Sequence, residues 1–223
     1  MIKAVIFDLD NTVYNYDGCH KIAMQELRKY ASVKYSITED VFNEAFEAAK
    51  RDVKCLLGNT GASHNRMLYM QLFLEKIGQN PVDSALDLYD VYWNTMLSNM
   101  ELFPYVIRLM QQLKEEGIII GVLTDLTAHI QHRKIAKLGL IPYIDAIVTS
   151  EEAGEEKPSK VAFERIALKI NCKSDEILMI GDSIKKDVEG AISMGMHGLL
   201  FVSDEKDRMN DKVMEYIHER MDK

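Results

Sequence analysis

Cysteine is scarce in this sequence, with three residues among 223. Cys19, Cys55 and Cys172 are odd in number, lie far apart and form no CxxC pair. This spacing favours neither a disulfide framework nor a zinc site. We expect three buried free thiols, as in a cytoplasmic protein.

Long apolar runs are also missing. No uncharged apolar stretch approaches the length that spans a membrane. Asp8 and Asp10 fall where the apolar part of a secretory signal would have to lie. The sequence therefore predicts a cytoplasmic protein with no membrane segment.

Positive charge is in the minority, since 27 Lys and Arg stand against 35 Asp and Glu, for a formal net charge of -8. A nucleic-acid or anionic-membrane surface needs clustered Lys and Arg, so we expect neither partner. A small phosphorylated ligand is still compatible, because it responds to local cations rather than to the net charge. The sequence leaves monomer and homodimer open.

What the chain does contain is a series of five short apolar runs, at residues 4–9, 118–123, 146–148, 177–180 and 199–202. They are continuous rather than alternating, as expected of parallel strands covered on both faces. Helical patterns precede or separate the last four runs, at residues 105–116, 127–138, 159–170 and 185–194, and a further amphipathic helix is expected at 211–223. This alternation predicts an α/β fold with a doubly wound parallel sheet of the Rossmann type.

Polar residues follow each apolar run. They are Asp8 and Asp10, Thr124 and Asp125, Thr149 and Ser150, Gly181 and Asp182, and Ser203 and Asp204. In an open α/β sheet, ligands bind beyond the carboxyl ends of the strands. We therefore expect these groups to converge on one site.

Residues 14–97 interrupt the alternation with helical periodicity and no strand. Four helices are expected there, at 18–32, 38–57, 62–76 and 82–97, with Thr38 as an N-cap. The stretch is rich in aromatic residues, which favour a small helical core over an aromatic substrate cage. The sequence thus predicts a core domain of residues 1–13 and 98–223 and an inserted helical domain of residues 14–97.

Four short segments, taken in chain order, resemble the four motifs of the haloacid dehalogenase-like (HAD) superfamily. They are DLDNT at 8–12, VLTD at 122–125, EKP at 156–158 and GDSIKKD at 181–187. The resemblance implies an HAD-like core, and the helical insertion after the first motif is similar to the type-one cap of that family.

Phosphoryl transfer depends on positioning and on neutralising charge, and a carboxylate can attack phosphorus to give an aspartyl-phosphate. For Asp8 to approach a phosphate dianion, cations must lie beside it. Mg²⁺ is suited to this because it prefers hard oxygen ligands, and Asp8 and Asp182 can supply them. The resemblance adds the backbone carbonyl of Asp10 as a third ligand. Lys157 would supply a second positive charge.

Thr124 is expected to bind phosphate through its hydroxyl group and the N–H that follows. By resemblance, Asp10 is the general acid and base, which first protonates the leaving oxygen and then activates water. Asp187 and Ser183 are expected to orient the metal ligands from behind. One residue departs from the family pattern, since Asp125 stands where members commonly have Asn, and we leave it out of the site.

The sequence predicts a Mg²⁺-dependent phosphatase of a small phosphorylated metabolite. A phosphomutase of the β-phosphoglucomutase type keeps both motif-one aspartates and the cap, so it stays open. A metal-independent 2-haloacid dehalogenase lacks the second of these aspartates, and Asp10 argues against it. A phospho-accepting receiver domain carries its acceptor on a middle strand and has no such helical insertion.

Substrate selection is expected in and near the inserted helices. Position and chemistry suggest Tyr14, Tyr16, Arg51, Asn65 and Arg66. For the two arginines the competing interpretation is a solvated surface residue.

Overall fold

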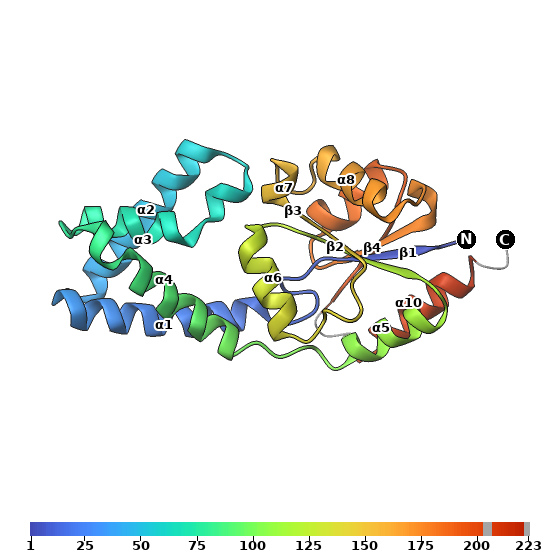
Figure 1. Ribbon diagram of the computed structural model, residues 1–223, viewed down its shortest axis with the longest axis horizontal. Coiled ribbons are helices and arrows are strands. Elements are labelled where there is room, and N and C mark those ends of the chain that lie inside the picture. The colour runs from blue at the N-terminus through green and yellow to red at the C-terminus, as the bar shows by residue number, and fades with distance from the viewer. Residues whose placement is uncertain (203–206, 221–223) are drawn as a thin grey trace. The chain divides into compact units, whose positions relative to one another are not determined.

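The computed structural model describes residues 1–202 and 207–220, and the chain divides into two compact units (Figure 1). The core unit comprises Met1–Asn15 and Glu101–Lys223, and the helical unit comprises Tyr16–Met100. Each unit has its own buried apolar residues, so each is described by itself.

The core unit contains one five-stranded sheet with the order β3-β2-β1-β4-β5. Its strands are β1 (Ala4–Phe7), β2 (Ile119–Thr124), β3 (Ala146–Thr149), β4 (Ile177–Gly181) and β5 (His197–Leu200). All four strand pairs are parallel, and Phe7 pairs with Val122 on one side and Ile180 on the other. The predicted doubly wound α/β sheet is confirmed, with β1 at its centre.

Helices cover both faces of this sheet. They are α5 (Tyr105–Glu115), α6 (Ala128–Lys137), α7 (Ser150–Ala153), α8 (Lys160–Ile170), α9 (Gly190–Ser193) and α10 (Met209–His218), with the short turns η2 (Ser174–Glu176) and η3 (Ile184–Glu189). On one face, Phe163 and Ile166 of α8 pack in a cluster with Ile6 and Met179 of the sheet. In Figure 1, α5 and α10 lie side by side away from α8. The continuous apolar runs are therefore explained by burial on two sides.

The helical unit consists of α1 (Tyr16–Tyr35), α2 (Glu39–Leu57), the 3₁₀ turn η1 (Gly61–His64), α3 (Arg66–Lys76) and α4 (Pro81–Ser98). Thr38 caps α2 as predicted, because its side chain accepts a hydrogen bond from the Val41 N–H. Phe42, Phe73 and Trp93 are buried. The aromatic residues thus build a core inside this unit. Among the described helices, none has the length and apolar character to cross a membrane.

Several expected boundaries were wrong. The helix expected at 62–76 is divided at Asn65, whose side chain accepts from the Met67 N–H and starts α3 there. The helix expected at 185–194 is divided into the π-helical turn η3 and the short α9. Strand β5 lies two residues earlier than expected, and Ser203 and Asp204 fall outside the described residues.

The prediction of three buried thiols is correct for one cysteine only. All three cysteines are free, but Cys19 is buried, Cys172 is half-buried and Cys55 is exposed. Cys55 lies on the outer side of the amphipathic helix α2, which buries Phe42, Phe46 and Val53 instead. Helical periodicity turns this residue to solvent.

Candidate active site

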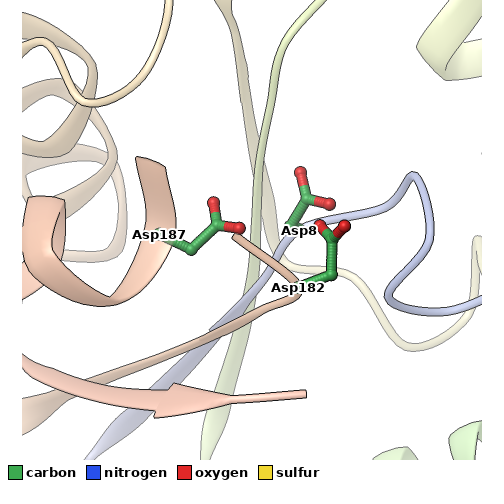
Figure 2. Close-up of side chains that lie close together, drawn as sticks. All are labelled: Asp8, Asp182 and Asp187. Carbon is green, nitrogen blue, oxygen red and sulfur yellow. The ribbon is translucent and has the colours of Figure 1, made fainter. Parts of the chain in front are cut away.

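Three carboxylates meet beyond the carboxyl end of the sheet. Asp8 follows β1, Asp182 follows β4 and Asp187 lies in η3. Each offers a carboxylate oxygen, and these oxygens lie within 4.8 Å of one another. Figure 2 shows the three side chains pointing toward a common space. The convergence expected from the strand ends is therefore present for Asp8 and Asp182.

Lys157 inserts its ammonium group into this cluster. Its Nζ lies 2.6 Å from Asp8 Oδ1 and 2.6 Å from Asp187 Oδ1, and it also donates to the Leu123 carbonyl at 3.1 Å. Lys157 is only 4% exposed. A buried ammonium needs such partners, so the expected cation belongs to the cluster.

The cluster has more negative than positive charge. Burial raises the pKa of Asp8 to about 8, with a further rise from Asp187 and Asp10 and an opposing effect from Lys157. Partial burial and the charge of Asp187 also raise the pKa of Asp182. Burial alone would lower the pKa of Lys157, but the surrounding carboxylates outweigh it and raise that pKa. One ammonium among three carboxylates leaves room for a further cation, and the donors are the hard oxygens that bind divalent ions such as Mg²⁺.

Asp187 is a member of this cluster, whereas we expected it to orient the metal ligands from behind. The turn η3 directs it inward, and Asp187 Oδ2 accepts a hydrogen bond from the Ser183 N–H at 3.0 Å. The Ser183 hydroxyl group caps the same turn by accepting from the Lys186 N–H. Gly181 makes room, because a Cβ at this position would overlap the Asp187 side chain.

Thr124 ends β2 at the same edge of the sheet and is 1% exposed. Its hydroxyl oxygen accepts a hydrogen bond from Gln131 Nε2 at 2.7 Å. Gln131 also donates to the Asp125 carbonyl at 2.7 Å. The loop after β2 is thus held from α6, by a residue that the sequence interpretation missed.

The Asp125 carboxylate is paired. Its Oδ1 accepts from the Lys157 N–H at 3.0 Å, and its Oδ2 lies 2.7 Å from Lys186 Nζ. Lys186 also lies 3.1 Å from Glu156 Oε2. Asp125 therefore joins the end of β2 to the loop that carries Lys157 and to η3.

Asp10 contacts Lys134 and Tyr14. Its two carboxylate oxygens lie 2.7 and 2.8 Å from Lys134 Nζ, and Oδ1 also accepts from the Tyr14 hydroxyl group at 2.6 Å. Lys134, on α6, is fully buried, and so is Tyr14. Tyr14 was expected to contact substrate, whereas here it supports Asp10. Lys134 was missed, although its place beside Ile130 and Ile135 on the apolar face of a helix was a readable signal.

A family model described as "Hydrolase: haloacid dehalogenase-like hydrolase" matches residues 2–195. The chain belongs to the haloacid dehalogenase-like hydrolase family. The resemblance of the four motifs is thereby confirmed, and the matched span includes all the residues of the cluster.

Two relatives of this haloacid dehalogenase-like chain cover most of its length. It is 38% identical to a ribulose-1,5-bisphosphate 5-phosphatase of Halopiger xanaduensis, over 90% of this chain and 85% of that protein. It is 28% identical to a glyceraldehyde 3-phosphate phosphatase of Methanocaldococcus jannaschii, over 97% of this chain and 92% of that protein.

Solved structures share the haloacid dehalogenase-like fold. An HAD phosphatase from Thermococcus onnurineus superimposes with a TM-score of 0.64 at 23% identity, covering 90% of this chain and 86% of that chain. A 2-haloacid dehalogenase from Pseudomonas syringae gives a TM-score of 0.71 at 22% identity, with the same coverage of 90% and 86%. At this level of identity the likeness supports the fold and not a particular reaction.

In the helical unit of this haloacid dehalogenase-like chain, two of the expected substrate residues lie together. Arg66 is 8% exposed, donates to the Tyr16 hydroxyl oxygen at 2.8 Å and to the His64 carbonyl at 2.8 Å. The competing interpretation of Arg66 as a solvated surface residue is therefore wrong. Asn65 is occupied as the cap of α3, and Arg51 is exposed on α2.

Proposed function

We propose that this chain is a Mg²⁺-dependent cytoplasmic phosphatase that hydrolyses a small phosphorylated metabolite through an aspartyl-phosphate on Asp8. The observation that carries the proposal is the cluster of the buried Asp8 and Asp187 with the more exposed Asp182, in which Lys157 pairs with the first two. Phosphatases among the relatives support the reaction class.

The proposed metal ligands are the carboxylates of Asp8 and Asp182 and the backbone carbonyl of Asp10, and the Asp187 carboxylate is close enough to contribute. When bound, Mg²⁺ supplies positive charge that offsets the charge of the phosphoryl group. The excess of carboxylates over ammonium groups supports a divalent cation here.

The chain's own residues divide the chemistry between two steps. In the first, an Asp8 oxygen bonds to phosphorus, the bond from phosphorus to the substrate oxygen breaks, and Asp10 gives its proton to that oxygen. In the second, Asp10 takes a proton from water, whose oxygen bonds to phosphorus and releases phosphate from Asp8. Lys157 and Thr124 hold the phosphoryl oxygens.

The substrate class that we propose is the phosphorylated sugars, because the two relatives are named for ribulose-1,5-bisphosphate and glyceraldehyde 3-phosphate. We assign the helical unit the role of the cap domain that selects among them. Tyr16 and Arg66 are its strongest candidates, since a buried guanidinium group beside tyrosine hydroxyl groups can bind anionic or hydroxylated ligands.

Asp10 separates this proposal from a metal-independent dehalogenase, which needs no general acid of this kind. A phosphomutase differs in its product, because it returns an isomeric phosphate ester instead of inorganic phosphate. Release of inorganic phosphate therefore distinguishes the two.

The experiment is phosphate release from a panel of sugar phosphates and from p-nitrophenyl phosphate, with Mg²⁺ and with a chelator. We expect activity only with Mg²⁺, and its loss in Asp8→Asn. Asp90→Asn, an exposed aspartate on α4, is the matched control and should keep activity. Activity that survives chelation or Asp8→Asn would refute the proposed mechanism.

A further inference from the structure

Helix α6 presents two polar side chains from its buried face to the site. Gln131 and Lys134 are three residues apart, so they lie on the same side of the helix. Both are fully buried. Gln131 donates to Thr124 Oγ1, and Lys134 donates to Asp10. A buried ammonium group costs free energy unless it is paired, and the Asp10 carboxylate pairs with Lys134.

The Asp10 carboxylate is fixed by three contacts. Lys134 Nζ reaches both of its oxygens, at 2.7 and 2.8 Å, and the Tyr14 hydroxyl group donates to Oδ1 at 2.6 Å. Lys134 Nζ also lies 5.9 Å from the centre of the Tyr14 ring. Contacts to both oxygens set the plane of the carboxylate as well as its position.

These contacts matter because of what lies next to Asp10. The carboxylates of Asp8, Asp182 and Asp187 form the group that would attract a cation, and Asp10 is outside it. A free Asp10 side chain could turn toward a cation bound there, since a carboxylate is a good ligand for divalent ions. Lys134 provides an alternative positive charge that keeps the carboxylate away.

We propose that Lys134 is a positioning residue for the reaction, which holds the Asp10 carboxylate in the orientation needed for proton transfer, with Tyr14 as its helper. The proposal rests on the proposed function, in which Asp10 serves as acid and base. Lys134 is fully buried, so we assign it no direct contact with substrate. Its loss should therefore slow the steps that need Asp10 and spare the attack by Asp8.

The test uses Lys134→Met, Tyr14→Phe and wild type with Mg²⁺. The substrates are p-nitrophenyl phosphate, whose leaving group departs without protonation, and the sugar phosphate that wild type hydrolyses best. We expect both variants to keep a first-turnover burst of nitrophenol within about threefold of wild type. Steady-state kcat should fall about 10- to 100-fold with both substrates, below the full effect of losing a general acid or base, and KM should change little.

Lys137→Met, an exposed lysine on the same helix, is the matched control and should match wild type. Tyr14→Phe keeps the ring and tests the same carboxylate if Lys134→Met does not fold. Equal loss in burst and steady state, a change in KM alone, or unchanged turnover would each overturn the role of Lys134. Turnover that persists in Asp8→Asn would end the proposed function as well, so the two failures are distinguishable.

Discussion

Asp125 departs from the family pattern, and neighbouring groups offset its added negative charge. Its position follows Thr124, where a second negative charge would repel a phosphate. Lys186 and the Lys157 N–H take up both of its oxygens. The departure thus comes with its own compensating cation, which lies on a different element.

The pairing of Asp125 with Lys186 predicts that substitution of Asp125 reverses the effect of Lys186→Met on KM. Lys186→Met should raise KM for a phosphorylated substrate about tenfold, equivalent to about 1.4 kcal/mol, because the Asp125 charge is then unpaired. Asp125→Asn alone should change KM by less than about threefold, and Asp125→Asn combined with Lys186→Met should restore KM. Steady-state kinetics of the four proteins form a complete cycle. The neighbouring exposed Lys185→Met is the control, and equal effects of Lys186→Met with and without Asp125 would contradict the pairing.

At the residue scale, the sequence predicts the groups whose place follows from topology. Asp8, Asp182 and Thr124 stand at strand ends, and parallel strands bring their ends together. Lys134 and Lys186 reach their partners from helical segments far along the chain, and no local pattern determines which carboxylate each one meets. Tyr14 was expected to contact substrate because the sequence gives its position after the first motif. The sequence does not give the direction of its side chain.

At the scale of elements, the turn η3 decides where Asp187 lies. Its π-helical geometry divides the expected helix, and such turns occur often at functional sites. The sequence pattern continues the helical period through this point, so periodicity alone does not reveal the break. The same limit applies to the helix divided at Asn65, where a local cap overrides the apolar repeat. The strands, by contrast, were predicted to within about two residues. The helix expected at 18–32 extends to Tyr35, and the helix expected at 211–223 begins at Met209 and ends at His218, while residues 221–223 lie outside the described part of the chain.

Gly181→Ala should disrupt the contact between β4 and η3. The added methyl group would overlap the Asp187 side chain, and overpacking of this kind costs about 1–3 kcal/mol. We expect a lower midpoint in chemical unfolding and at least a tenfold loss of kcat, because Asp187 must move. Gly121→Ala, where the new Cβ would make contacts of 3.4 Å to Ile6 and Ile166, is the milder control. A Gly181→Ala protein with normal stability and turnover would contradict this close fit.

Helix α1 carries a half-buried histidine that predicts a dependence of stability on pH. His20 lies 2.7 Å from the Tyr92 hydroxyl group, and burial, with the charge of Arg66, lowers its pKa to about 4. The folded protein therefore holds neutral His20. Its contribution to stability is complete above the ordinary value of 6.5 and is lost as the pH falls from 6.5 through about 4.

The measurement is urea unfolding of wild type and His20→Gln across this range. Glutamine can still bond to Tyr92 but does not titrate, so wild type should lose stability relative to the variant as the pH falls. The exposed His132→Gln on α6 is the control, and its curve should run parallel to that of wild type. A constant difference between wild type and His20→Gln would contradict a half-buried imidazole that stays neutral in the folded protein.

At the scale of the whole molecule, the proposed metal site and the proposed specificity residues belong to different units. Asp8, Asp182, Asp187 and Lys157 all lie in the core unit, whereas Tyr16 and Arg66 lie in the helical unit. The two roles can therefore be changed separately. The fold class was readable from the sequence, since it rests on periodicity over many residues, and the identity of the substrate was not.

Addition of Mg²⁺ should stabilise the core unit. A ligand at 100 times its Kd contributes about 2.7 kcal/mol, so amide hydrogen exchange should slow at the ends of β1 and β4 and in η3. Exchange in residues 16–100 should change less. Asp182→Asn should abolish the effect, and Asp90→Asn should leave it intact. Equal protection throughout the chain, or protection that survives Asp182→Asn, would place the ion elsewhere.

The central position of β1 has a consequence for the order in which the protein is made. This strand is translated before both of its partners, since β2 and β4 follow the whole helical unit in the sequence. At 5–20 residues per second, Asp182 is added roughly 10–35 seconds after Asp8. During that interval the nascent chain carries an apolar strand with unpaired edges. Chaperone binding and premature aggregation would both act on this stage, before Asp8, the proposed nucleophile, has Lys157, Asp182 or Asp187 beside it.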